Sequence, residues 1–180
     1  MIIADISGKG ISAALLASTL QGLVHAQIMA GQSLVKIATI ANQYICEKSL
    51  QKYATLVLLR LTSDGALEYM NCGHVQPLLQ TDTEVKVLPN GNLPVGLIDG
   101  ATYSSETIQM KPGERVLLVT DGVTEAEDPA GEFYGDDRLQ AIVMSGTTIE
   151  ELFHDVETFM RGAPPNDDCT MLEICFDECG

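Results

Sequence analysis

Three stretches of the sequence place an aspartate at the end of a short apolar run, next to turn residues. They are IIAD, ending at Asp5; VLLVTDG, which holds Asp121 and Gly122; and NDD, in which Asp167 and Asp168 precede the last apolar run. Acids mounted on strand ends can converge although they are far apart in the sequence. Crowded carboxylates repel one another unless a cation neutralises them, and Mg²⁺ or Mn²⁺ prefers oxygen ligands. The pattern favours a two-ion site that activates water and holds a phosphoryl group.

Each acid taken alone also fits a simpler interpretation, because Asp before Gly at a strand end is a frequent turn former. The stretch DISGKG is not a nucleotide P-loop, since that motif requires GxxxxGK[ST]. Here Gly8-Lys9 is followed by Gly10, and Ile3 stands five positions before Gly8. What remains is a glycine turn that leads into a helix N-terminus, which attracts anions weakly. The residues alone leave the turn and the metal site both open.

Composition limits the function classes. The chain has 180 residues and a formal net charge of −15, from 25 acids and 10 bases. Such a charge disfavours nucleic acid and anionic membrane surfaces as partners. The five cysteines show no CxxC spacing, which indicates reduced thiols and a cytoplasmic protein. Zinc at Cys175 and Cys179 is disfavoured, because no second Cys or His pair stands nearby.

The elements that must position the acids follow from periodicity and turn signals. The pattern predicts one α+β domain over residues 1–180, long enough for a single core. A hairpin is expected around Ser63-Asp64-Gly65. The expected helices span about 12–30, 33–48, 136–144 and 147–161, and the expected strands span 2–5, 53–61, 66–73, 76–80, 85–88, 104–110, 115–122 and 169–176.

The uncharged stretch between Lys9 and Lys36 is long enough to resemble a membrane span. The predicted helix is nevertheless amphipathic. Ser18, Gln21 and His25 fall on one side, and an apolar stripe of Leu16, Leu20, Leu23 and Val24 falls on the other. A two-faced helix is half buried in a soluble protein, so no membrane segment is expected here.

Six blocks, spread from residue 2 to residue 176, resemble the bacterial SpoIIE/RsbU-like serine phosphatases, which belong to the metal-dependent PPM superfamily. The blocks are ADISGKGISAALL, YATLVLLRL, LEYMNCGHVQPLL, LPVGL, LLVTDGVTEAEDPAGEFYGDDRL and NDDCTML. The resemblance implies an α–β–β–α sandwich of two antiparallel sheets flanked by helix pairs. It also implies a Mg²⁺ or Mn²⁺ centre at which a metal-activated water attacks phosphoserine or phosphothreonine.

The same resemblance implies roles for the acids. Asp5 would bridge two metals, and the carbonyl of Ile6 would contact one of them. Asp121 and Asp167 would hold the other metal, with Asp168 as the alternative if the alignment shifts by one residue. Asp5, Asp121 and Asp167 are therefore the expected catalytic set.

Other residues of the blocks have weaker assignments. Gly8 and Gly122 are expected next to the metal ligands. His74 of NCGH would bind substrate or shuttle a proton, or else fix a strand end by hydrogen bonds, which is the favoured alternative for a lone histidine. Lys9 would meet a phosphate or simply be exposed. Eukaryotic relatives carry a histidine two residues after the bridging Asp, where this sequence has Ser7.

The chain departs from the family pattern at its start. Family members carry further strands and an acidic motif resembling GDYYD before this point, and that motif contributes to the second metal. The expectation is a domain incomplete at its N-terminus, with a weaker second metal site. An unpaired sheet edge would favour a homodimer.

The resemblance also implies partners. The expected substrate is a phosphorylated STAS-type anti-sigma-factor antagonist in a stress-response pathway, and an upstream sensor or receiver domain is common in relatives. The alternative function is a catalytically weak or inactive module that binds a partner. A Mg²⁺-dependent nucleotide enzyme is disfavoured, because the sequence shows no base- or ribose-binding motif.

Overall fold

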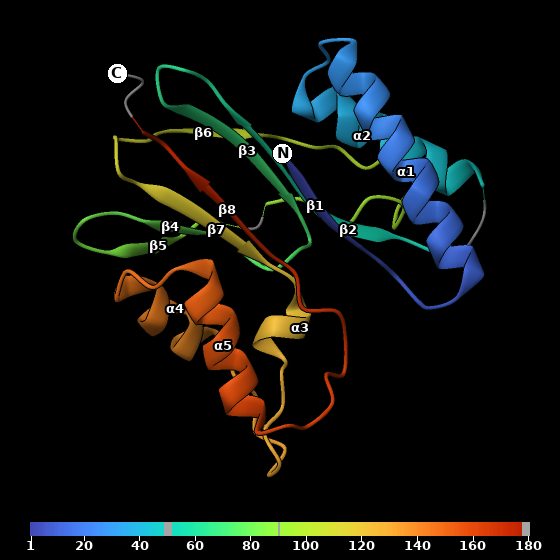
Figure 1. Ribbon diagram of the computed structural model, residues 1–180. Coiled ribbons are helices and arrows are strands. Elements are labelled where there is room, and N and C mark those ends of the chain that lie inside the picture. Colours follow the sequence, from blue (N-terminus) through green and yellow to red (C-terminus); the bar gives the residue numbers. More distant parts are fainter. Residues whose placement is uncertain (49–51, 90, 178–180) are drawn as a thin grey trace. The chain divides into compact units, whose positions relative to one another are not determined.

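The computed structural model describes residues 1–48, 52–89 and 91–177 (Figure 1). This described part contains eight strands and five helices, and the strands form two four-stranded antiparallel sheets. The chain divides into a first unit, Met1–His74 with Asn90–Gln109, and a second unit, Val75–Pro89 with Met110–Gly180. Each unit carries one sheet and its own helices, so the predicted α+β class is confirmed.

The sheet of the first unit has the strand order β1-β2-β3-β6. Its strands are β1 (Ile2–Ile6), β2 (Ala54–Leu61), β3 (Ala66–Cys72) and β6 (Glu106–Gln109). The predicted hairpin joins β2 to β3, where the amide of Gly65, at φ 83°, donates to the Thr62 carbonyl over 3.0 Å. The pairing of β1 with β2 sets Asp5 opposite Thr55.

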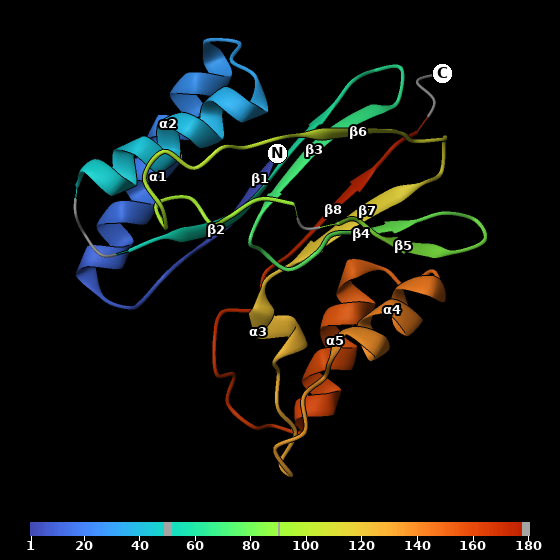
Figure 2. The ribbon, with the colours of Figure 1, turned by 180° about the vertical axis from the view of Figure 1, so that it is seen from behind.

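Two helices cover this sheet, α1 (Ile11–Met29) and α2 (Leu34–Glu47), which lie side by side in Figures 1 and 2. The N-cap of helix α2 is Ser33, whose hydroxyl oxygen accepts from the Lys36 amide. Apolar side chains of both helices and of β2 form one core, which includes Leu16, Leu20, Val24, Ile37, Ala41, Ile45, Leu56 and Leu58.

Helix α1 is long and apolar enough to cross a membrane by length and composition. The predicted apolar stripe is nevertheless inside the first unit, since Leu16, Leu20 and Val24 are at most 3% exposed. The opposite face is less polar than the sequence suggested, because Ile11 and Leu15 are 82% and 65% exposed. The helix therefore has a buried apolar stripe and an uncharged outer surface.

The second unit has a sheet of order β5-β4-β7-β8. Its strands are β4 (Leu78–Gln80), β5 (Val85–Val87), β7 (Arg115–Val119) and β8 (Met171–Cys175). Strand β7 is central and pairs with both β4 and β8. Its inward residues Leu117 and Val119 belong to a core with Leu139, Val143, Leu152, Val156 and Met160 of the following helices.

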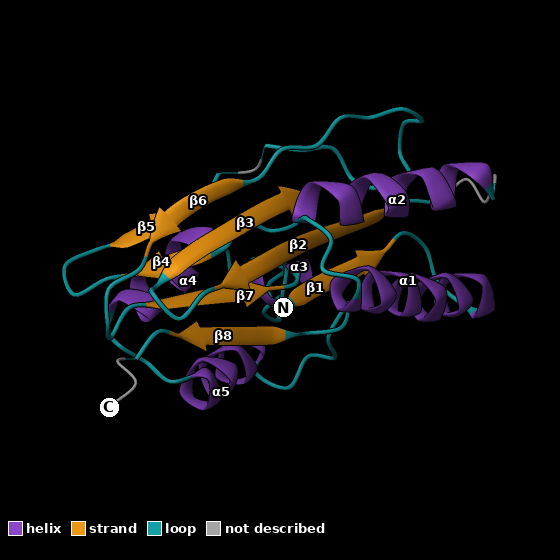
Figure 3. Cartoon of the chain, turned by 90° about the horizontal axis from the view of Figure 1, so that it is seen from above, coloured by secondary structure: helices purple, strands orange, loops and turns teal. Residues whose placement is uncertain are grey.

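The helices of the second unit are α3 (Asp121–Thr124), α4 (Asp136–Met144) and α5 (Ile149–Met160). Helix α5 packs against β8 (Figure 3). One sequence boundary was wrong: the strand predicted to reach residue 122 ends at Val119, and Asp121 begins a helical turn. The amide of Val123 donates to the Thr120 carbonyl over 3.0 Å, which starts this turn. The cysteines of the described part are free thiols, and Cys179 lies outside the described residues.

Candidate metal centre

Thr120 ties the end of β7 to the segment that precedes β8. Its side chain is 7% exposed, and its hydroxyl donates to the Asp168 carbonyl over 2.8 Å and accepts from the Thr170 amide over 2.9 Å. The Thr120 amide donates to the Thr170 carbonyl over 3.0 Å. These bonds hold the backbone of Asp121 next to that of Asp168, although 48 residues separate Thr120 from Asp168.

Gly122 allows this approach. A Cβ atom at this position would lie 2.5 Å from the Asp168 carbonyl oxygen and 3.2 Å from the Asp167 carbonyl carbon. Real Cβ atoms do not come so close to backbone atoms, so any larger residue would push the two segments apart. The structure therefore brings together Asp121, Gly122, Asp167 and Asp168 along the backbone.

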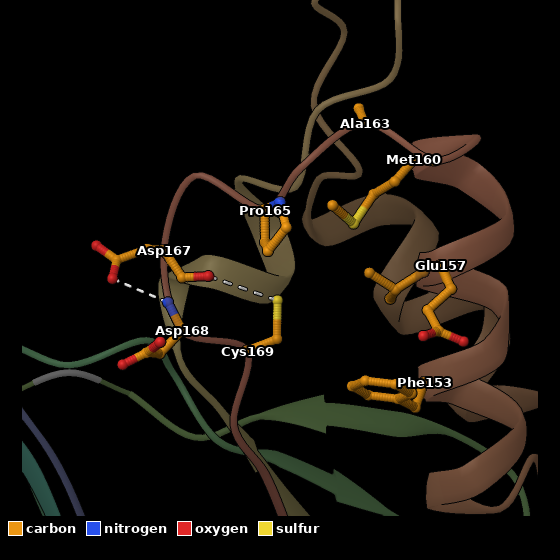
Figure 4. A pocket seen from close by; sticks show the side chains of 10 residues that line it. Phe153, Glu157, Met160, Ala163, Pro165, Asp167, Asp168 and Cys169 are labelled. Atoms are coloured by element: carbon orange, nitrogen blue, oxygen red, sulfur yellow. Dashed lines mark hydrogen bonds between the residues drawn. The ribbon is translucent and has the colours of Figure 1, made fainter.

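The NDD loop is held by its own side chains. The Asp167 carboxylate accepts from the backbone amide of Asp168 over 2.9 Å. The side-chain amide of Asn166 donates to the Glu127 carboxylate over 2.7 Å. In Figure 4 the side chains of Asp167 and Asp168 point away from α5. Both are exposed, and Asp121 is half-buried. The carboxylates are accessible to an ion from solvent.

Cys169 follows these acids, and its side chain lies on the side of the loop away from the two carboxylates (Figure 4). Burial raises the pKa of its thiol, and the Asp168 and Asp167 carboxylates raise it further. The protonated thiol donates to the Gly122 carbonyl over 2.9 Å. Cys169 thus adds a third link between the Gly122 turn and the NDD loop.

Asp5 belongs to the first unit, near the end of β1, and is exposed. The loop after it is held by residues that precede β2. The Ser7 amide donates to the Tyr53 carbonyl over 2.9 Å, and the Ser7 hydroxyl accepts from the Tyr53 amide over 2.8 Å. The Lys52 ammonium donates to the Ser7 carbonyl over 3.1 Å. The turn that follows Asp5 is therefore fastened to Lys52 and Tyr53 through Ser7.

Gly8 completes this turn at φ +82°, a conformation that favours glycine, and a Cβ there would lie 2.7 Å from the Lys52 ammonium nitrogen. Lys9 is exposed. Lys52 was missed by the sequence analysis, and no local pattern marks it. Thr120 was also missed by the sequence analysis, although a threonine directly before an acid can signal the N-cap of a helix.

His74 is 6% exposed and held at the end of β3. Its amide donates to the Asn71 side-chain oxygen over 2.8 Å, and its carbonyl accepts from the Asn71 side-chain nitrogen over 3.0 Å. Its Nδ1 shares a hydrogen bond of 2.9 Å with the Thr55 hydroxyl. Because Thr55 is the residue opposite Asp5, His74 is linked to that position through one side chain.

The donor chemistry fits a hard divalent cation. Within either unit, the described residues contain no group of three His, Cys, Asp or Glu side chains arranged around an ion. Mg²⁺, however, usually keeps several waters and is bound through one or two carboxylates. Asp121 and the Asp167–Asp168 pair supply carboxylates of this kind on adjacent backbone segments of the second unit.

Comparison with known families gives the class of the protein. The family model described as stage II sporulation protein E (SpoIIE) matches residues 1–177, so the chain belongs to the SpoIIE family. Phosphoserine phosphatase RsbP of Bacillus subtilis is 29% identical over 147 residues, which are 78% of this chain and 36% of RsbP. Protein IcfG of Synechocystis sp. is 27% identical over 144 residues, 75% of this chain and 23% of IcfG. The chain thus spans well under half of these relatives.

Solved structures share the fold. The SiaA-PP2C domain of Pseudomonas aeruginosa superposes with a TM-score of 0.86 at 18% identity, covering 98% of this chain and 75% of that one. The RsbU and RsbW domains of Rv1364c from Mycobacterium tuberculosis give 0.79 at 27% identity, with 98% and 51% coverage. RsbX in complex with magnesium gives 0.73 at 20% identity, with 96% and 78% coverage. Family and fold together place the chain in the SpoIIE family, with a fold that it shares with solved PP2C-type domains.

Proposed function

We propose that this chain is a metal-dependent protein serine/threonine phosphatase that hydrolyses phosphoserine by direct attack of water. The observation that carries the proposal is the contact between Gly122 and the Asp167–Asp168 backbone, which sets Asp121 beside the NDD loop. The solved RsbX structure, which shares this fold, is in complex with magnesium, and this supports a requirement for a divalent ion. The products are the free serine hydroxyl and inorganic phosphate.

Asp121 and Asp167 would hold one Mg²⁺ or Mn²⁺ ion, with Asp168 as the alternative ligand to Asp167. Such an ion lowers the pKa of bound water and neutralises charge on phosphoryl oxygens. Asp5 and the Ile6 carbonyl are the proposed ligands from the first unit, on the basis of the DISG motif and the fixed turn around Ser7. In that unit His74, through Thr55, would orient the region opposite Asp5, and Lys9 would attract the phosphate.

We further propose a phosphorylated STAS-type anti-sigma-factor antagonist, or a similar phosphoprotein, as the substrate. Its support is the likeness to RsbP, a phosphoserine phosphatase by name, and to the RsbU domain of Rv1364c. The strongly acidic surface, at a formal charge of −15, would favour a substrate with basic residues near the phosphoserine.

The first test is Asp121→Asn, which keeps the size of the side chain and removes its charge. Mn²⁺-dependent hydrolysis of p-nitrophenyl phosphate should fall at least a hundredfold, because one metal would lose an anionic ligand, while the circular dichroism spectrum stays native. Asp136→Asn is the matched control, since Asp136 is also an acid in the first turn of a helix. It should retain full activity.

Unchanged turnover in Asp121→Asn would contradict the site assignment. A wild-type chain that binds the phosphoprotein but never releases phosphate with any divalent metal would identify the alternative, a binding module without catalysis.

A further inference from the structure

A pocket of about 390 Å³ lies in the second unit between α5 and the loop that leads to β8 (Figure 4). Its apolar lining comes from Phe153, Val156, Met160, Ala163, Pro165 and Cys169. Val156 and Met160 form a buried floor, at 2% and 7% exposure, whereas Phe153 is an exposed wall at 43%. An apolar hollow with one exposed aromatic wall can take up a large apolar side chain from outside.

The charged side chains that line this pocket are all acidic. Glu157 on α5 and Asp167 and Asp168 on the facing loop are its ionisable carboxylates, and none of the described lining residues is Lys, Arg or His. Glu157 is 59% exposed, and its carboxylate lies 3.9 Å from Nδ1 of the exposed His154, a contact that is an ion pair only when the histidine is protonated. Charge complementarity therefore favours an occupant that carries a positive charge next to its apolar group.

The pocket shares a wall with the candidate metal ligands. Residues Asp167, Asp168 and Cys169 line it, and in Figure 4 the two carboxylates lie on one side of the loop and the Cys169 side chain on the other. The same segment is fixed to β7 and α3 by the bonds of Thr120 and by the Cys169–Gly122 contact. An occupant of the pocket is thereby held against a rigid loop that also carries Asp167.

We propose that this pocket is a substrate subsite, which binds an apolar side chain a few residues from the phosphoserine in the phosphoprotein, with a Lys or Arg beside that side chain. This inference rests on the proposed phosphatase function and adds to it how the substrate is selected. The apolar side chain fills the hollow against Phe153, and the neighbouring cation meets Glu157. A peptide anchored there presents its phosphoserine to the acids on the other side of the loop.

The test uses a set of phosphoserine peptides in which each of the four positions on either side of the phosphoserine is Leu, Ala or Asp in turn. With Mn²⁺, wild type should prefer Leu over Ala at one position by about tenfold or more in kcat/KM, as expected for several buried methylene groups. Phe153→Ala should reduce this preference to about twofold, and should lower turnover of the Leu peptide relative to p-nitrophenyl phosphate. The matched control is Phe133→Ala, an exposed phenylalanine (59%, against 43% for Phe153) outside the pocket, which should keep the full preference.

Charge reversal tests the second half of the inference. Peptides with Lys or Glu beside the preferred Leu should differ in wild type, and Glu157→Lys should invert the order. Glu150→Lys, on the same helix but outside the pocket, should leave the order as it is in wild type.

The outcomes separate the subsite from the function on which it rests. Mn²⁺-dependent turnover of p-nitrophenyl phosphate without a Leu preference at any position overturns the subsite alone. So does a preference that survives in Phe153→Ala or disappears in Phe133→Ala. Absence of all metal-dependent turnover in wild type overturns the proposed function, and the subsite with it.

Discussion

Gly122 and Thr120 show how single residues fix the candidate site of the second unit. The hydroxyl of Thr120 bonds to both flanks of Cys169, and the missing side chain of Gly122 leaves room for the Asp168 carbonyl. Neither residue needs to touch an ion to matter. Each sets the backbone from which the carboxylates project.

Gly122→Ala should separate Asp121 from the NDD loop. The new Cβ meets backbone rather than a flexible side chain, so relief requires a shift of the loop. We expect the free energy of unfolding to fall by about 1–3 kcal/mol and the Mn²⁺ affinity, measured by calorimetry, to weaken about tenfold.

Gly22→Ala is the matched control for this substitution. Gly22 also lies in a helix, and a Cβ there would meet nothing within 4 Å. Its replacement should stabilise the protein by about 0.5–1 kcal/mol through helix propensity alone. Equal Mn²⁺ affinity in Gly122→Ala and Gly22→Ala would show that the close approach has no role in the site.

At the scale of elements, the helices pack into the core of their unit through one apolar stripe. Helix α1 carries no charged residue, yet it belongs to the core of the first unit through Leu16, Leu20 and Val24. Helix α5 begins with a complete capping box between Thr148 and Glu151 and supplies the floor of the pocket. Both helices were predicted with nearly their observed limits, because their signals are local.

Leu20→Ala should destabilise the protein far more than Leu15→Ala. Leu20 is 2% exposed and Leu15 is 65% exposed on the same helix. A buried leucine truncated to alanine costs about 2–5 kcal/mol, because a cavity remains, whereas a surface change costs within about 0.5 kcal/mol. Urea unfolding measures both, and similar losses for the two variants would show that α1 does not pack through the predicted stripe.

Thr148→Ala should lower the free energy of unfolding by about 1 kcal/mol, since it removes the side-chain acceptor of the Glu151 amide at the start of α5. Thr158→Ala is the control within the same helix. Thr158 is exposed, and alanine is the better helix former, so this variant should be neutral or slightly more stable. Thermal unfolding that ranks the two variants in the opposite order would contradict the capping argument.

On the scale of the whole molecule, the excess of acids shapes both stability and partners. A formal charge of −15 on 180 residues creates self-repulsion in the folded state. Bound divalent ions relieve part of that repulsion wherever carboxylates gather. The proposed ion at Asp121 and Asp167 would relieve the repulsion between these two carboxylates.

Mn²⁺ should therefore raise the melting temperature of the wild-type chain. At a concentration of about 100 times Kd, binding contributes about 2.7 kcal/mol, which corresponds to roughly 5–10 °C for a chain of this size. Removal of the ion with EDTA should reverse the shift. Sodium chloride at equal ionic strength controls for general screening, and an undiminished Mn²⁺ shift in Asp121→Asn would place the ion elsewhere.

The sequence by itself determined the α+β class, the order of the main helices and strands, the apolar stripe of α1 and the family. These depend on periodicity, turn residues and short motifs, which are local properties of the chain. It also marked Asp5, Asp121 and Asp167 as candidate ligands, and their role as ligands stays a prediction. It extended the β7 strand too far, because the backbone turns into a helix at Asp121, where the Val123 amide donates to the Thr120 carbonyl, and hydrophobic alternation does not register that turn.

Only the tertiary structure decided which segments meet. The approach of Asp167 and Asp168 to Gly122 and the hydrogen bond from Lys52 to the Ser7 carbonyl join residues that are distant in the chain. The apolar pocket forms where the loop after α5 folds back toward that helix. Such contacts depend on how whole elements pack, and close packing of this kind leaves no trace in residue spacing. The acids and Gly122 could be named from the sequence, but the contact that Gly122 makes, the role of Thr120 and the pocket beside them became visible only in the folded chain.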